Sequence, residues 1–240
     1  MIILTLRKWF GFQLVEVSAA EQFIAAVGGG LSILTLICFS FWALPGAGAT
    51  AIITSMGASA VLLFAVPHGP LSQPWSVIGG NGISAVIGVA CAYFIPYPHV
   101  AAGCAVGLSI WAMAQLKCLH PPGGATAFTA VMGGSAIHNP GFRFVLFPVL
   151  TNAVVMLLLA LLINRVFKWR RYPAILNQPA QPPPPPSPED ARPPTHEEVL
   201  AALKSLDSFV DISEPDLIRL TQLLSRSESH CLDQEAQKLS

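Results

Sequence analysis

Long apolar blocks, separated by short polar or proline-containing segments, fill the chain from about residue 23 to residue 163. A membrane-spanning helix needs about 20 apolar residues. Five blocks approach or reach that length: 23–44, 47–66, 77–95, 101–119 and 144–163. A sixth block, 122–137, is shorter and would cover about 24 Å as a helix, against about 30 Å for the hydrocarbon core. The pattern predicts an all-α, polytopic bundle of transmembrane helices.

Basic residues flank both ends of this apolar region: Arg7, Lys8, Arg165, Lys168, Arg170 and Arg171. Because positive charge marks the cytoplasmic side, we expect both termini in the cytoplasm and an even number of crossings. The short block at 122–137 is therefore expected to cross, which gives about six spans. We expect a multi-pass protein of the cell inner (plasma) membrane.

Composition divides the chain into four predicted parts. These are an N-terminal cytoplasmic segment (1–22), a transmembrane domain (23–171), a proline-rich linker (172–194) and a cytoplasmic tail of short amphipathic helices (195–240). A run of five prolines makes the linker semi-rigid. The tail helices alone are too small to bury a stable core. Docking on the cytoplasmic surface, pairing between protomers in a homo-oligomer, and disorder all stay open for the tail.

Charge is scarce in the apolar region. Between Gln22 and Asn164 the only Asp, Glu, Lys or Arg residues are Lys117 and Arg143. A cation pathway or a carboxylate proton relay would normally carry Asp or Glu inside the membrane. The sequence therefore favours an anion or a neutral solute, with the lipid bilayer as the surrounding partner and no nucleic acid.

The segment from His120 to Ala127 has the sequence His-Pro-Pro-Gly-Gly-Ala-Thr-Ala. Proline suits the first turn of a helix, so we expect a helix that starts here with free N–H groups from Gly123 to Thr126. Helix N-termini bind anions, and Lys117, one turn before His120, would face the same side of the preceding helix. The predicted substrate-binding residues are Lys117, His120, Pro121, Pro122, Gly123, Gly124 and Thr126.

Several of these residues have a purely structural alternative. His120 is either a ligand contact, a protonatable gate or a hydrogen-bonded turn residue. Lys117 is either part of the site or a side chain that snorkels to the interface, and Arg143 is either functional or an interfacial anchor. Further candidates for the pathway are Thr50, Ser59, Asn81 and Arg143.

An earlier segment echoes the signature. Residues 45–51 and 121–127 are identical at five of seven positions, and both contain Gly-Ala-Thr-Ala. In a bundle of six spans the two copies would open helices of opposite direction, as in a 3+3 inverted repeat. Chance similarity in a chain rich in glycine and alanine is the alternative.

Enzyme chemistry is not indicated. The histidines lack the spacing of metal ligands and the cysteines form no CxxC pair. No nucleophile–base pair or carboxylate pair stands out. We therefore expect no catalytic residue, no metal and no cofactor.

The His-Pro-Pro-Gly-Gly segment strongly resembles the signature of the HPP family of integral membrane proteins. The segments Gly-Ala-Ser-Ala at 57–60, Pro-Leu-Ser-Gln-Pro-Trp at 70–75 and Asn-Arg at 164–165 add to the resemblance. Characterised members are associated with nitrite transport in cyanobacteria and plastids, so the resemblance implies a transporter or channel for a small inorganic anion, with nitrite first. The tail helices resemble linker helices of relatives that carry CBS domains, but this chain is too short for a pair. The alternative function is a non-transporting membrane scaffold or sensor that recruits a cytoplasmic partner through its tail.

Overall fold

The computed structural model describes residues 17–43 and 49–177. Residues 1–16 of the predicted segment 1–22 lie outside these residues, as do residues 178–194 of the linker and the tail at 195–240. Side chains are described from residue 54 onward in the second helix, so the side chain of Thr50 is outside them as well. Residues Gln22–Gln178 form one compact unit.

The described part of the chain is helical and contains no strand. Its six long helices are α2 (Ala19–Ala43), α3 (Ala49–Ala65), α4 (Pro74–Phe94), α5 (Pro98–Gln115), α6 (Pro121–Met132) and α8 (Thr151–Arg165). Shorter elements are η1 (Pro70–Ser72), α7 (Ser135–His138), η2 (Val145–Leu150), η3 (Lys168–Arg170) and η4 (Ala174–Asn177). The all-α transmembrane bundle predicted from the apolar blocks is confirmed.

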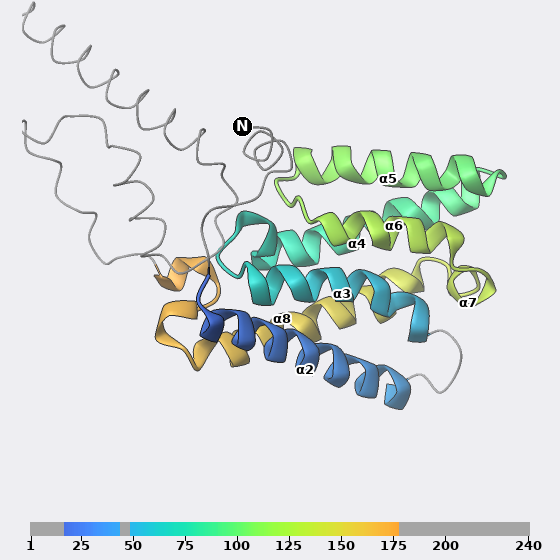
Figure 1. Ribbon diagram of the computed structural model, residues 1–240. Helices are drawn as coiled ribbons and strands as arrows, with labels where there is room; N and C mark the ends of the chain where they lie inside the picture. The colour runs from blue at the N-terminus through green and yellow to red at the C-terminus, as the bar shows by residue number, and fades with distance from the viewer. Residues whose placement is uncertain (1–16, 44–48, 178–240) are drawn as a thin grey trace, which may run out of the picture. The chain divides into compact units, whose positions relative to one another are not determined.

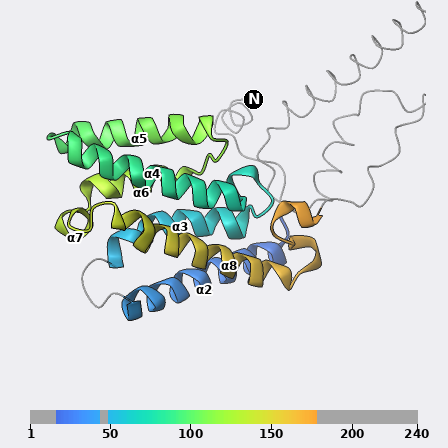
Figure 2. The ribbon, with the colours of Figure 1, turned by 180° about the vertical axis from the view of Figure 1, so that it is seen from behind.

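Successive long helices run in alternating directions (Figures 1 and 2). The starts of α2, α4 and α6 and the ends of α3, α5 and α8 therefore lie at one end of the bundle, which we call the signature end because α6 begins there. Within the described residues, three helical segments are each long and apolar enough to cross a membrane: Ala19–Phe41, Pro74–Phe94 and Val145–Arg165. The direction of α6, opposite to α5 and α8, matches the crossing predicted for the short block.

Two predicted spans are interrupted. The block at 122–137 forms α6, which covers only about 18 Å, and then the separate turn α7. Gly133 caps the end of α6, and Gly134 after it has φ +72° and ψ −165°, a backbone conformation that glycine adopts readily and other residues rarely do. The block at 144–163 is broken at Phe147, whose backbone is not helical, just before Pro148. Proline removes a helical hydrogen bond and clashes with the preceding turn, which explains the break.

The predicted span 101–119 ends early, at Gln115. Cys118 N donates to Met113 O at 2.9 Å, Lys117 N donates to Ala114 O at 3.3 Å, and Lys117 has φ 53°. These are the two hydrogen bonds and the left-handed residue of a Schellman motif. Lys117 occupies the position where glycine is usual, and the chain leaves the helix before it reaches His120.

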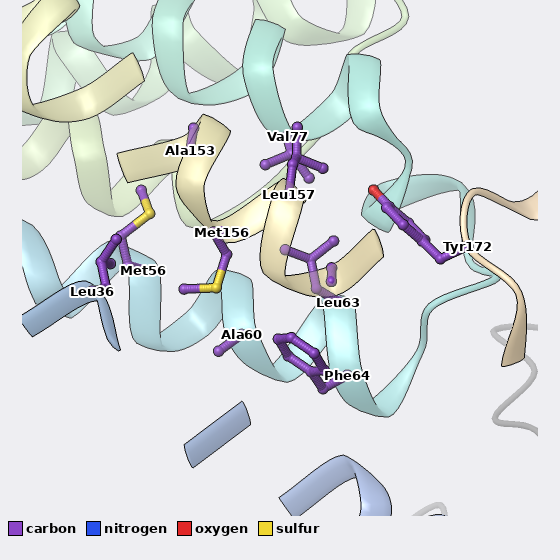
Figure 3. Packing of buried hydrophobic residues seen from close by; sticks show 11 residues of the cluster. Leu36, Met56, Ala60, Leu63, Phe64, Val77, Ala153, Met156, Leu157 and Tyr172 are labelled. Carbon is purple, nitrogen blue, oxygen red and sulfur yellow. The ribbon is translucent and has the colours of Figure 1, made fainter. Parts of the chain in front are cut away.

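A cluster of buried side chains from α2, α3, α4 and α8 fills one half of the bundle (Figure 3). Leu36, Met56, Met156 and Phe64 are each at most 1% exposed. Tyr172, which follows α8, belongs to the same cluster (Figure 3). The segment after the last long helix therefore belongs to the folded core.

Most of the first copy of the sequence echo, residues 45–48, lies outside the described residues. The helices that the two copies open, α3 and α6, run in opposite directions (Figure 1). Opposite direction is required by an inverted repeat but also follows from the alternation of neighbouring helices. The 3+3 repeat stays a prediction.

Candidate functional site

His120 is the residue around which the signature end is organised. It lies in the connection between α5 and α6, and its side chain is 0% exposed. Nδ1 lies 2.9 Å from the carbonyl oxygen of Leu71, in the turn between α3 and α4. Nε2 lies 3.0 Å from the hydroxyl of Ser59 on α3. The imidazole thus ties the start of α6 to two other parts of the fold.

These contacts determine how the imidazole is protonated. A carbonyl oxygen can only accept a hydrogen bond, so Nδ1 carries the proton and donates to Leu71. In the neutral ring Nε2 is then an acceptor, and the Ser59 hydroxyl donates to it. Burial lowers the pKa of His120 to about 4, which outweighs the opposing effect of the Leu71 hydrogen bond. In this structure His120 is a neutral, fully bonded residue.

A second buried polar pair joins α6 to α4. The hydroxyl of Thr126 lies 2.7 Å from Asn81 Oδ1 and 3.2 Å from the carbonyl of Pro122. Asn81 Nδ2 donates to the carbonyl of Val77 at 2.9 Å. Asn81 and Thr126 are at most 2% exposed. Uncharged polar side chains from α3, α4 and α6 therefore pair with one another inside the bundle.

The glycines of the signature allow α6 to lie directly against α4. A Cβ built on Gly123 would come within 2.8 Å of both Gly80 O and Ser84 Oγ, and one on Gly80 would come within 2.5 Å of His120 Cβ. About two turns further along both helices, a Cβ on Gly88 would come within 2.7 Å of Ala130 Cβ. Small residues four apart are the usual means of close helix packing in membranes. The spacing of Gly80, Ser84 and Gly88 was a sequence signal that our prediction missed.

The expectation of free N–H groups at the start of α6 is wrong. Pro121 and Pro122 have no N–H group, and Gly123 N donates to His120 O at 2.8 Å. Gly124 and the residues after it lie within α6, where helical geometry directs each N–H to the carbonyl four residues earlier. The positive end of the helix dipole remains, but the proline pair and the bond to His120 leave no donor of the first turn unpaired.

The other signature residues differ in their surroundings. Pro121 is exposed and Pro122 is buried. Gly124 is half-buried, and a Cβ there would meet only Val106 Cγ1, at 4.0 Å. Unlike Gly80 and Gly123, this glycine is not required by packing.

Lys117 and Arg143, the two charged residues between Gln22 and Asn164, do not lie together in the structure. Lys117 is exposed and lies outside α5, whereas His120 is buried, so the prediction that both face one side of a helix is wrong. The left-handed turn at Lys117 is the cause. Arg143 is also exposed and lies between α7 and η2, and α7 lies at the end of the bundle opposite the start of α6 (Figure 1). Of the predicted residues, the structure brings together Ser59, Asn81, His120, Pro122, Gly123 and Thr126.

Arg170 is a buried charge that our sequence prediction treated only as a topology signal. Its side chain is 0% exposed, and Nη2 donates to the carbonyl of Phe64 at 2.6 Å. Nε and Nη2 each lie 3.2 Å from Asn164 Oδ1, and Asn164 Nδ2 donates to Leu63 O at 3.3 Å. Both carbonyls belong to the last turn of α3, where cations are stabilised by the helix dipole.

Tyr172 and Gln73 continue this network to the turn that His120 contacts. Tyr172 Oη donates to the carbonyl of Ser72 at 2.6 Å, and Ala174 N donates to Gln73 Oε1 at 3.0 Å. Gln73 Nε2 in turn donates to the carbonyls of Pro67 and Gly69 at 3.1 and 2.9 Å. The segment after α8 is therefore bonded to the same turn as the signature.

A cavity of about 160 Å³ lies at the opposite end of α6. Its lining residues are Val89, Ala92, Tyr93, Ala130, Ile137, His138 and Gly141. His138 Nε2 donates to the carbonyl of Val131 at 2.8 Å. Within the described residues, no group of three or more His, Cys, Asp or Glu side chains could hold a metal ion.

Comparison with known proteins agrees with this architecture. Two transmembrane proteins of Dictyostelium discoideum are 45% and 40% identical to the chain over 126 residues, which is 51% of this chain in both cases. The matched part is 44% and 40% of those proteins, so the chain spans less than half the length of these relatives. No solved structure matches. The profile of the family "HPP, transmembrane region" matches residues 15–173, and the chain therefore belongs to the HPP family of transmembrane proteins.

Proposed function

We propose that this HPP-family membrane protein moves a small inorganic anion across the bilayer, with nitrite as the first candidate. The observation that carries the proposal is the absence of negative charge, together with the uncharged polar side chains, in the membrane region. The region from Gln22 to Asn164 contains no carboxylate, and among the described residues Glu21, buried in the first turn of α2, is the one carboxylate. The buried pairs in this region, Ser59 with His120 at the signature end and Asn81 with Thr126, are uncharged hydrogen-bonding groups. A polar membrane interior without carboxylates favours an anion over a cation.

The pathway that we propose follows α6. Ser59, Asn81, His120 and Thr126 would exchange the hydrogen bonds that they make with one another for bonds to the passing anion. Lys117, exposed at the signature end, would raise the local anion concentration through its charge. The cavity beside Ala130 and His138 would form the opposite mouth, where α6 is too short to fill the membrane.

The orientation that we propose places the signature end in the cytoplasm of a cell with the protein in its inner (plasma) membrane. Arg165, Lys168 and Arg171 are exposed at that end, directly after α8, and exposed cations near the end of a span are retained on the cytoplasmic side. Enzymatic reporters fused to the full chain at its C-terminus would test this placement, because a reporter that works only in the cytoplasm should be active.

The test of transport is nitrite flux into liposomes that contain the purified full-length chain. Nitrate, formate and chloride, each at two pH values, define selectivity. Ser59→Ala and Thr126→Val should each lower nitrite flux about tenfold, the equivalent of one hydrogen bond of ordinary net strength. Ser109→Ala is the matched control, because Ser109 Oγ is buried on α5 without a partner among the described residues. Absence of flux through the unaltered protein would refute the proposal.

The contacts that the signature makes within the protein favour the scaffold alternative. Gly123 is explained by contact with α4, and both nitrogens of His120 are bonded within the protein. A signature of this kind could have a purely architectural purpose, with recruitment carried out by the tail. Deletion of residues 179–240 separates the two functions, because a transporter should retain flux whereas a scaffold should lose its partner.

A further inference from the structure

The segment that follows α8 is bonded to the signature end at three places. Arg170 holds the last turn of α3 through Phe64 O. Tyr172 Oη holds Ser72 O at 2.6 Å, and Ala174 N holds Gln73 Oε1 at 3.0 Å. These contacts join residues about 100 positions apart in sequence. We call residues 168–174 the return segment.

The return segment and the signature meet in one turn. Ser72 follows Leu71, and the carbonyl of Leu71 accepts the hydrogen bond from His120 Nδ1. Ser72 Oγ itself donates to Leu62 O and Val66 O at the end of α3, at 3.0 and 2.7 Å. The rigid peptide groups that carry the Leu71 and Ser72 carbonyls meet at the Cα of Ser72, and both residues lie in η1. A movement of Ser72 away from Tyr172 therefore also displaces the acceptor of His120.

The return segment lies close in sequence to the last described residue. It overlaps the first residues of the predicted proline-rich linker (172–194) and ends three residues before Asn177, the last described residue. A semi-rigid linker transmits displacement better than a flexible one. Anything that pulls on the chain beyond residue 177 therefore acts first on Ala174 and Tyr172.

We propose that the return segment is a latch that keeps the signature turn closed, and that release of Tyr172 from Ser72 opens this turn locally while the rest of the bundle stays folded. Tyr172 and Ala174 are positioning residues that act on His120 through the turn at Leu71 and Ser72. The latch is a property of the fold and does not rest on anion transport, so it stands or falls separately from the proposed function.

Cys118 provides a natural reporter for this opening. It lies two residues before His120, is 0% exposed, and packs against α4, where a Cβ on Gly79 would come within 3.0 Å of Cys118 Cβ. Cys91 is also buried, at 6% exposure, but lies near the far end of α4. A thiol reagent that reaches Cys118 without Cys91 reports local opening, and equal reaction of both reports global unfolding.

The experiment compares the full-length protein with Tyr172→Phe, which removes only the hydroxyl. The proteins in detergent micelles are treated with a maleimide, and mass spectrometry of the cysteine peptides gives the two labelling rates. We expect Cys118 to react about tenfold faster in the variant, the ratio that corresponds to one lost hydrogen bond, with Cys91 unchanged. Tyr97→Phe, an exposed tyrosine at the opposite end, should leave both rates unchanged.

Two results would overturn the latch. Unchanged labelling of Cys118 in Tyr172→Phe would show that the hydroxyl does not hold the turn closed. Parallel increases at Cys118 and Cys91 would show that Tyr172 contributes only to the stability of the whole bundle. Since neither readout involves nitrite, a protein that moves no anion can still confirm the latch, and a transporting protein can still refute it.

Discussion

His120 and Tyr172 bind consecutive backbone carbonyls: the imidazole donates to Leu71 O at 2.9 Å and the phenol to Ser72 O at 2.6 Å. One side chain comes from the signature and the other from the segment after the last long helix. A buried carbonyl that loses its partner costs about 1–3 kcal/mol, so both donors are needed to keep this turn in place. The signature is thus one part of a larger closed arrangement at its end of the bundle.

The buried His120 makes the folded protein sensitive to acid. Its pKa of about 4 lies below the ordinary 6.5, so the unfolded chain binds the proton first. The contribution of neutral His120 to the stability of the fold is therefore present above pH 6.5, and it is lost as the pH falls from 6.5 towards 4. His120→Gln should be less stable at pH 7.5 but should lose less stability on acidification. Thermal unfolding in detergent across this range measures both effects, and equal slopes for the two proteins would assign the acid sensitivity elsewhere.

Close packing between α4 and α6 predicts a contrast between two glycines. Gly80→Ala places a methyl group against His120 Cβ and should destabilise the protein by about 1–3 kcal/mol, the usual result of overpacking. Gly107→Ala is the control, because a Cβ there meets nothing within 4 Å and alanine is the better helix former by up to about 1 kcal/mol. Denaturation midpoints should move in opposite directions. A similar loss in both would mean that the contact at Gly80 is relaxed in solution.

The buried guanidinium of Arg170 predicts a similar contrast between neighbours. Arg170→Met leaves the carbonyl of Phe64 and the side chain of Asn164 without these donors, and we expect a loss of about 1.5–3 kcal/mol from the hydrogen bonds of a charged group. Arg171→Met, at an exposed position, should change stability by less than about 0.5 kcal/mol. The two variants carry the same change in charge and differ only in burial. Unfolding in detergent compares them, and equal stability would contradict the contacts at Arg170.

The helices were predictable from the sequence because each crossing needs a long apolar block. The even number of crossings, argued from charge at the two ends, stays a prediction. The interruptions were less predictable. Gly133 and Gly134 end α6 inside a block that reads as continuous, and the break at Phe147 lies within an apolar run. Hydropathy indicates whether a segment is apolar enough to lie in the bilayer. It does not indicate where the backbone of that segment leaves the helical conformation. Helix limits were therefore the weakest part of the prediction.

The candidate site was predicted in its residues but not in its contacts. His120, Thr126, Ser59 and Asn81 were named individually, yet their pairing depends on how α3, α4 and α6 pack. Arg170 was read as a topology signal because a basic residue after a span is usually solvated. Burial of its guanidinium depends on the fold of the return segment, which the local sequence pattern does not encode.

Lys117 combines a backbone effect with a charge effect, and two substitutions separate them. A non-glycine residue in the left-handed region costs about 1 kcal/mol or more, and Lys117 has φ 53°. Lys117→Gly should therefore stabilise the protein by about 1 kcal/mol, whereas Lys117→Gln, which keeps the Cβ, should leave stability unchanged. If the exposed charge attracts the anion as proposed, both variants should lower nitrite flux at low salt, and the loss should shrink as ionic strength rises. Unaltered flux in Lys117→Gln would remove the charge from the mechanism, and an unaltered melting temperature in Lys117→Gly would contradict the strained turn.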